Sequence, residues 1–203
     1  MRFLSFEANG QAGIGWVKDI HATDFVNLTL AAPELPRNLK DLICTSGGLT
    51  AADAAARKAP ASAVQAISSV TMLPLIPNPG KIVCMGLNYA DHAKEGGNAR
   101  PEFPSFFLRG NSSMVGHNQA IVRPKASTQL DYEAELAVII GKKARHLTAD
   151  NALDCIAGYS CFNDGSIRNY QANRRNGRLV KTLTAQVRLA LAWSHQTSYH
   201  QVQ

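Results

Sequence analysis

The sequence predicts a strand-rich α+β protein in which a small N-terminal α+β domain precedes a larger domain. Polar and apolar residues alternate in short runs over residues 1–33, an alanine-rich segment follows, and extended apolar segments recur after a proline cluster. The chain has 203 residues, of which 45% are hydrophobic and 18% charged. This length and composition are sufficient for one or two packed domains.

Two classes of protein are not favoured by composition. No run approaches the ~18 apolar residues of a membrane-spanning helix, and the first residues, MRFLSFEANG, lack the features of a signal peptide. We therefore expect a cytoplasmic protein without a membrane partner. The cysteines include no C-x-x-C pair, which argues against a disulfide framework or a zinc knuckle; they are Cys44, Cys84, Cys155 and Cys161.

The N-terminal domain is expected to cover residues 1–75. Residues 1–33 favour two or three short antiparallel strands, with glycines at the turns. Residues 41–69 contain many alanines at helical intervals and are interrupted by Pro60, which predicts one or two small helices. The domain boundary is marked by prolines, which disfavour helices and lack a ladder donor; these are Pro74, Pro77 and Pro79.

The second domain is expected to cover residues 80–171 and to contain mostly strands. The segment KIVCMGLNYA suggests a buried strand that runs into a polar turn, and DHAKEGG suggests a short helix. Further extended segments are predicted in PSFFLRG, AIVRPK and LDYEAELAVIIGKKAR, the last as one long strand. The segment ALDCIAGYSCFND predicts a helix that leads into a strand and ends in a polar turn.

The clearest candidate site lies at the start of the long predicted strand. Side chains alternate along a strand, so Glu133 and Glu135 point the same way, with Asp131 at the edge. An isolated E-x-E pair most often lies on a solvated face. The apolar LAVIIG that follows predicts burial, however, and carboxylates at the mouth of a buried strand suggest ligands for Mg²⁺, Mn²⁺ or Ca²⁺.

Two further motifs carry groups that could act beside a metal ion. Asp164 follows an apolar segment, where an aspartate is most often a cap or a turn former. A helix over DHAKEGG would place His92 and Glu95 on one face, so the carboxylate could orient the imidazole; a surface pair is an equal alternative. A base beside a metal suits chemistry on water or on a carbon-bound proton next to a carbonyl.

Together these motifs resemble the fumarylacetoacetate hydrolase family. The matching segments occur in the family's order: KIVCMGLNYADHAKE, P-x-x-P-S-F-F-L-R, LDYEAELAVIIGKKAR and AGYSCFNDGSIRNYQ. The resemblance implies a mixed β-roll domain, incomplete at its C-terminal end, and a homodimer. It also implies that Glu133, Glu135 and Asp164 hold the metal, usually Mg²⁺, that His92 and Glu95 form a base-and-orienter dyad on a lid, and that Gln171 contacts substrate.

The activity implied by the resemblance is the breakdown of small oxo-acids. Members of the family hydrolyse, decarboxylate, hydrate or isomerise such acids, and the metal stabilises an enolate. Arg109 is a candidate contact for a second substrate carboxylate, with a solvated surface arginine as the alternative. Gly165 and Asn169 stand where the family more often has Val and Asp, which changes the local turn and removes no ligand.

The resemblance stops after Gln171. Family members continue with a segment like Q-W-T-x-G-K-N-F-D-x-x-G-x-F-G-P, whose lysine contributes to the active site, whereas residues 172–203 carry five basic residues and no acid. Codons shifted by one frame from Asn176 can encode W-T-V-G-K-N-F-D-S-T-G-A-F-G-P. We therefore hypothesise a frameshift near residues 171–176 that removes the lysine and the closing strands, and we expect weak or absent activity.

Two other interpretations stay open. The chain could be a non-catalytic remnant, or a partner subunit that assembles with an intact paralogue. A nucleic-acid-binding protein that uses the basic tail is less favoured, because the tail has no interleaved aromatic residues and loses its charge in the shifted frame. That interpretation would rest on phosphate contacts from Arg174, Arg175, Arg178, Lys181 and Arg188.

Overall fold

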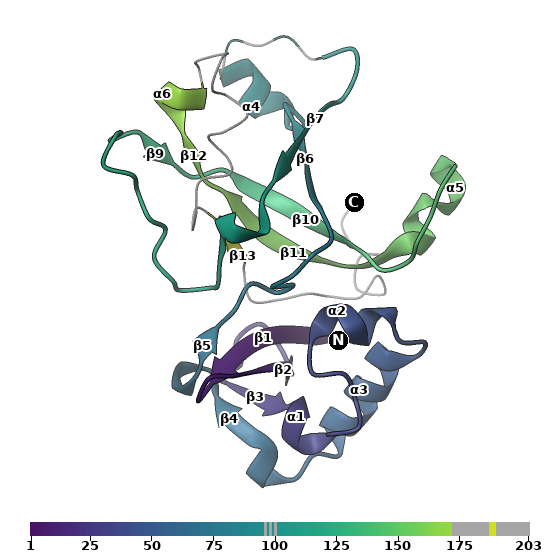
Figure 1. Ribbon diagram of the computed structural model, residues 1–203. Coiled ribbons are helices and arrows are strands. Elements are labelled where there is room, and N and C mark those ends of the chain that lie inside the picture. Colours follow the sequence, from purple (N-terminus) through teal and green to yellow (C-terminus); the bar gives the residue numbers. More distant parts are fainter. Residues whose placement is uncertain (96, 98, 100, 172–186, 190–203) are drawn as a thin grey trace.

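The computed structural model describes residues 1–95, 97, 99, 101–171 and 187–189 (Figure 1). An N-terminal lobe of one sheet and several helices lies below a second, strand-rich lobe in the view of Figure 1. This architecture confirms the predicted strand-rich α+β class. No helix in the described ranges is long and apolar enough to cross a membrane.

The sheet of the N-terminal lobe is built on a tight hairpin. Asn9 and Gly10, both with positive φ (51° and 73°), form its two-residue turn, and Ala8 pairs with Gln11. Asn-Gly is the sequence that such hairpin turns prefer. The strands lie in the order β4-β3-β2-β1-β5, with bounds β1 Arg2–Ala8, β2 Gln11–Val17, β3 Asp24–Asn27, β4 Val64–Ala66 and β5 Thr71–Met72. The strands expected in residues 1–33 are confirmed. The placement of the glycines at turns holds for Gly10 but was wrong for Gly13 and Gly15, which pair with β1 inside β2.

Three short helices cover one face of this sheet: α1 Leu28–Ala31, α2 Leu39–Cys44 and α3 Gly48–Arg57. The side chains of Asn27 and Asn38 accept backbone N–H bonds at the starts of α1 and α2, which satisfies donors that a helix leaves unpaired there. Two 3₁₀ turns follow, η1 Ala61–Ala63 and η2 Ile67–Ser69. The helical expectation was wrong for residues 64–66, which pair with β3 because the sheet offers them a ladder partner.

Both faces of the N-terminal sheet are buried. Phe3 packs with the helices in one cluster, whereas Leu4, next along β1, packs with Phe6 and Phe25 on the opposite face. Partly buried side chains of the second lobe also pack against the first cluster; they are Met114, Ala137, Ile139, Ala157 and Phe162. The two lobes therefore share a core.

The second lobe contains several small sheets. The largest has the strand order β10-β11-β13-β8, and two-stranded sheets pair β12 with β9 and β6 with β7. The strands are β6 Ile82–Gly86, β7 Ser105–Arg109, β8 Met114–Val115, β9 Leu130–Asp131, β10 Ala134–Ile140, β11 Ile156–Asp164, β12 Ser166–Ile167 and β13 Val187–Leu189. The helices are α4 Ala90–Glu95, η3 Asn111–Ser113, α5 Ala149–Ala152, η4 Leu153–Cys155 and α6 Arg168–Gln171.

Two strand expectations in this lobe were wrong. Residues 130–145 do not form one strand, because the chain leaves the ladder at Tyr132 and Glu133 and places β9 and β10 in different sheets. Residues 120–125 form no strand, since they pair with no neighbour and include Pro124, which cannot donate a ladder bond. β11 continues through Asp164, where a turn was expected.

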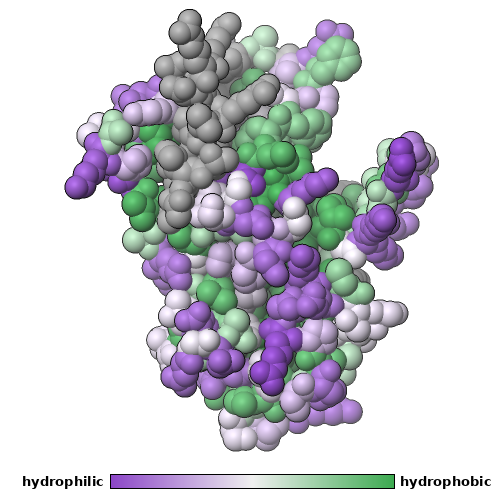
Figure 2. All heavy atoms as spheres, in the orientation of Figure 1, coloured by the Kyte–Doolittle hydropathy of each residue, from purple (hydrophilic) through white to green (hydrophobic). Residues whose placement is uncertain are grey.

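The burial predicted for the apolar segments at residues 82–86 and 136–141 was also wrong. On β6 and β7 one face is solvent-exposed and formed by Val83, Met85, Phe106 and Leu108, which are 42–61% exposed; we call it the β6–β7 apolar face. Figure 2 shows hydrophobic side chains on the visible surface where Figure 1 places these strands. Leu136, Val138 and Ile140 on β10 are exposed as well. No described segment covers these side chains.

The proposed division into residues 1–75, 80–171 and 172–203 remains a prediction. The segment between β5 and β6 contains the expected prolines and no regular element. Of the tail, only β13 is described, and it pairs with β11 and β8. The other residues of the tail lie outside the described part of the chain.

Candidate metal centre

Three carboxylates converge at the ends of two paired strands. Glu133, Glu135 and Asp164 each offer one oxygen, and these oxygens lie within 4.8 Å of one another. Antiparallel pairing sets this geometry. Glu135 lies opposite Phe162 on β11, and Asp164, two residues further along β11, points to the same face of the sheet. Glu133 and Asp164 are 7% and 2% exposed and Glu135 is partly buried, so the E-x-E pair does not lie on a fully solvated face. The structure therefore brings together the three residues expected to hold the metal.

The backbone around Glu133 is fixed although it lies outside both strands. The Asp164 amide donates to the Glu133 carbonyl at 2.8 Å, and the Glu133 amide donates to Asn163 Oδ1 at 3.1 Å. These bonds tie Glu133 to the end of β11. Tyr132, the preceding residue, is 74% exposed, so the break between β9 and β10 turns one side chain outward and the next inward.

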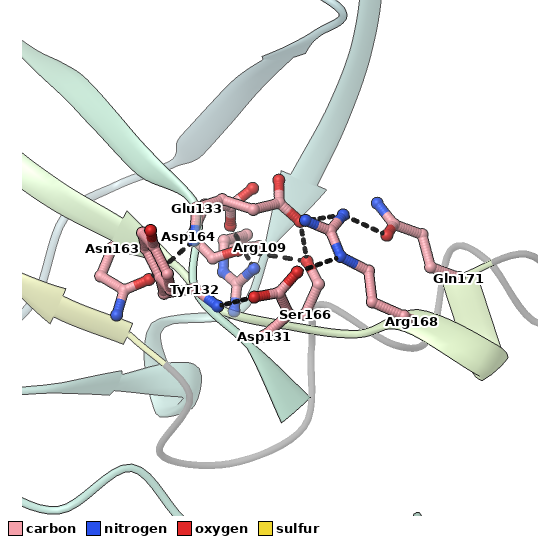
Figure 3. A network of polar contacts seen from close by, with 9 residues as sticks. All are labelled: Arg109, Asp131, Tyr132, Glu133, Asn163, Asp164, Ser166, Arg168 and Gln171. Atoms are coloured by element: carbon pink, nitrogen blue, oxygen red, sulfur yellow. Dashed lines mark hydrogen bonds and ion pairs between the residues drawn. The ribbon is translucent and has the colours of Figure 1, made fainter. Parts of the chain in front are cut away.

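Arg109 lies at the end of β7 and is buried with Asp164. Its Nη1 donates to Asp164 Oδ1, and the two side chains are 0% and 3% exposed (Figure 3). Burial lowers the pKa of Arg109 below its ordinary value, partly offset by the nearby Asp164, Cys84 and Glu133. Nε and Nη2 find no hydrogen-bond partner among the described residues. The alternative of a solvated surface arginine is therefore wrong.

A second arginine, Arg168, joins several side chains around the site. Its Nε donates to Asp131 Oδ2 at 2.8 Å, and its Nη1 donates to Glu133 Oε1 at 3.1 Å and to Gln171 Oε1 at 2.9 Å (Figure 3). Ser166 Oγ also donates to Glu133 Oε1. Sequence reasoning did not assign Arg168 or Ser166 to the site. Both residues lie in the segment AGYSCFNDGSIRNYQ, and its match to the family could have indicated that they belong to the site.

The charges around the site fit a divalent cation. Among the described residues, Arg109 pairs with Asp164 and Arg168 pairs with Asp131 and Glu133, and the carboxylate of Glu135 lies in the same cluster. The formal sum is about −2 when ordinary ionisation is assumed. Carboxylate oxygens are the ligands that Mg²⁺, Mn²⁺ and Ca²⁺ prefer. The donor set therefore fits a hard divalent ion, with Glu133, Glu135 and Asp164 as its ligands.

The predicted dyad lies on α4, beside the carboxylate site. A helix over Ala90–Glu95 agrees with the expectation, but the side chains of His92 and Glu95 lie outside the described part of the structure. Tyr89, just before the helix, accepts a hydrogen bond through its hydroxyl from the amide of Leu136 at 3.1 Å. Because Leu136 follows Glu135, this bond holds the start of α4 next to the candidate metal centre.

Fold and site together define an α+β protein with a buried carboxylate cluster, and comparison with known proteins gives its family. Residues 81–187 match the model of the fumarylacetoacetate (FAA) hydrolase C-terminal family. This match covers more than half of the chain, and the protein belongs to this family. The resemblance found in the four sequence segments is confirmed.

Two of the curated relatives are named as enzymes with different activities. The chain is 38% identical over 155 residues to the human mitochondrial protein named oxaloacetate tautomerase FAHD2A, which covers 75% of this chain and 48% of the relative. It is 46% identical over 101 residues to the homoprotocatechuate catabolism bifunctional isomerase/decarboxylase of Escherichia coli, covering 49% of this chain and 24% of the relative. The chain spans about half the length of the human relative.

The fold agrees with solved structures of the family. The fumarylacetoacetate hydrolase of Exiguobacterium antarcticum superposes with a TM-score of 0.74 at 28% identity, over 98% of this chain and 68% of that structure. A cytoplasmic location remains a prediction, because the named human relative is mitochondrial.

Proposed function

We propose that this chain carries the metal site of an enzyme that acts on a small 2-oxo or diketo acid. The supporting observation is the convergence of Glu133, Glu135 and Asp164, which lie in the segment that matches the family. The human relative is named an oxaloacetate tautomerase and the bacterial one an isomerase/decarboxylase, which are both consistent with enolate chemistry. Mg²⁺ is the proposed ion, with Mn²⁺ and Ca²⁺ as alternatives.

The residues of the site would have separate roles in metal binding, proton transfer and substrate contact. A bound divalent ion would supply stabilisation of the negative charge that develops on an enolate oxygen. Glu133, Glu135 and Asp164 would hold the ion, and His92 with Glu95 would move the proton or activate water. Gln171 would contact the substrate. Arg109 would keep its ion pair with Asp164, so a direct contact with a second substrate carboxylate stays a prediction.

Metal binding and enolisation test the proposed function separately. Calorimetric titration with Mg²⁺ and Mn²⁺ should show one bound ion per chain, and Glu135→Gln should weaken it by about tenfold or more. Glu34→Gln, which changes an exposed glutamate in the N-terminal lobe, serves as the control. Exchange of the methyl protons of pyruvate in D₂O, followed by NMR, reports enolisation. A wild-type chain that takes up neither metal would contradict the proposal.

One structural observation favours the alternative of a non-catalytic remnant or partner subunit. The β6–β7 apolar face and the exposed side chains of β10 lie on strands close to the candidate site, and no described segment covers them. We infer that a frameshift near residues 171–176 replaced the segment that completes the domain. Sequencing of the gene decides this, because codons that cannot encode the family segment in the shifted frame would refute it.

The frame-restored chain separates the two candidate functions. If the frameshift is correct, the restored chain should exchange pyruvate protons and turn over a member of a panel of 2-oxo and 3-oxo acids, whereas the 203-residue chain should be weak or inactive. Robust turnover by the 203-residue chain would contradict the remnant interpretation. Co-purification with an intact paralogue would support a partner subunit.

A homodimer and the absence of nucleic-acid binding remain predictions. Sedimentation tests the homodimer, and salt-dependent retention on DNA tests nucleic-acid binding.

A further inference from the structure

The thiol of Cys84 lies on the same side of the β6–β7 pair as Arg109. Side chains alternate along a strand, so Cys84 points away from the apolar face that carries Val83 and Met85. Cys84 lies opposite Phe107 in the ladder, and Arg109, two residues further along β7, points to the same side. Long side chains reach such diagonal neighbours in an antiparallel pair, so the ladder brings the Arg109 side chain to Cys84.

The Arg109 guanidinium has donors to spare for a second anion. Its side chain is 0% exposed and Nη1 donates to Asp164, but Nε and Nη2 find no acceptor among the residues that the structure describes. Buried donors without acceptors are costly, which favours negative charge beside them. Burial lowers the pKa of Arg109, and attraction to Asp164 and then to Cys84 are the largest effects that oppose the lowering. Because this attraction is mutual, the guanidinium favours the thiolate form of Cys84.

We propose that Cys84 is a modification site, a nucleophilic thiol that Arg109 activates for reaction with hydrogen peroxide. The thiolate sulfur attacks one oxygen of the peroxide, an S–O bond forms as the O–O bond breaks, and Cys84 becomes a sulfenic acid. The other oxygen leaves as hydroxide, so the sulfur loses two electrons and the peroxide gains them. Cys84 is partly exposed, as this reaction requires. The inference requires no metal ion and is independent of the proposed function.

The first test compares the four cysteines within the wild-type chain. Cys44 and Cys161 are more exposed than Cys84, and Cys155 is buried. If exposure alone set the rates, Cys44 and Cys161 would react first. The purified chain is treated briefly with hydrogen peroxide, the sulfenic acids are trapped with dimedone, and mass spectrometry gives the rate at each cysteine. Cys84 should react about tenfold faster than Cys44 or Cys161.

The second test removes the positive charge and then restores it. Arg109→Met leaves the Cys84 sulfur at least as accessible, because methionine is the smaller side chain, yet the reaction at Cys84 should slow by about tenfold. Arg109→Lys restores the charge and should recover most of the rate. Arg145→Met, which changes an exposed arginine of the second lobe, should leave the rate unchanged. The buried Cys155 reports folding, since its reaction stays slow only in a folded variant.

Each outcome supports or overturns the inference. If Cys84 of the wild type reacts no faster than Cys44 and Cys161, the inference is wrong. If Arg109→Met reacts at Cys84 as fast as the wild type while Cys155 stays slow, activation by Arg109 is wrong. If rapid reaction of Cys155 shows that Arg109→Met is unfolded, the order of the four cysteines in the wild type decides.

Discussion

Arg109 and Asp164 form an ion pair in which both side chains are almost completely buried, although 55 positions separate them in the sequence. Asp164 is also one of the three clustered carboxylates, so a guanidinium and a metal ion would share this residue. Loss of one partner from a buried pair leaves an uncompensated charge, which is more costly than the pair itself. In the absence of metal, Arg109 therefore compensates the negative charge of the buried Asp164.

The Arg109–Asp164 pair predicts that Arg109→Met destabilises the metal-free protein by about 3 kcal/mol, measured by urea unfolding. Saturating Mg²⁺ should recover part of this loss, because the cation supplies positive charge to Asp164. Arg145→Met, which changes an exposed arginine of the second lobe, should have little effect under either condition. An Arg109→Met protein as stable as the wild type without metal would contradict the prediction.

The position of α4 predicts a role for His92 in proton transfer but not in metal binding. In the frame-restored chain, His92→Gln should slow proton exchange of pyruvate by about 100-fold or more, since a general base is lost. Mn²⁺ affinity should not change, because the proposed ligands of the ion are Glu133, Glu135 and Asp164. Equal exchange rates, or a large loss of Mn²⁺ binding, would show that His92 has another role.

The contact between Asp53 and Trp16 predicts a pH-dependent contribution to stability. Burial on its own raises the pKa of Asp53, but hydrogen bonds from Arg57 and Trp16 outweigh it and hold the pKa below the ordinary 3.8. The folded protein thus binds fewer protons at Asp53 than the unfolded chain, so the stabilisation is present above pH ~4 and is lost as the pH falls through the lower folded value.

Asp53→Asn should therefore be less stable than the wild type at neutral pH and equal to it near pH 2. The variant keeps an oxygen that can accept from Trp16 Nε1, so the difference reports mainly the charge. Urea unfolding at several pH values measures it. Asp150→Asn, at an exposed position, provides the control. A difference between variant and wild type that does not change with pH would exclude this explanation.

The β6–β7 apolar face predicts self-association of the chain. Phe106→Thr combined with Leu108→Lys should reduce light scattering and binding of a hydrophobic dye, because exposed apolar patches favour aggregation. The unfolding free energy should change little, since both side chains are about 60% exposed. Phe107→Thr alters the opposite face of the same strand and should destabilise without improving solubility. Unchanged scattering in the double variant would show that another surface drives association.

Local sequence signals predicted much of this fold. The turn at Gly10 and the alternation of Glu133 with Glu135 depend on neighbouring residues, and both are found in the structure. The break between β9 and β10 was not predictable in this way, because strand propensity continues across Tyr132 and Glu133. Burial of β6 and β10 was not predictable either, because it requires a second segment to pack over them, and their own sequence does not show whether one does.

The site shows the same division between local and long-range information. Clustering of three carboxylates followed from motifs in the right order, whereas the contacts of Arg109 and Arg168 join residues 55 and 35 positions apart to their carboxylate partners. An arginine in a sequence gives no sign of which carboxylate it will meet. These partners become visible only when the strands are assembled.

The division of the candidate ligands between β11, β10 and the residue preceding β10 has a consequence for folding itself. A shift of β10 by one residue against β11 would turn Glu135 to the opposite side of the ladder and abolish the cluster. A divalent ion would then bind only chains with correctly aligned strands and stabilise them by mass action. The magnesium concentration during synthesis would thus influence how often the chain reaches its native strand alignment.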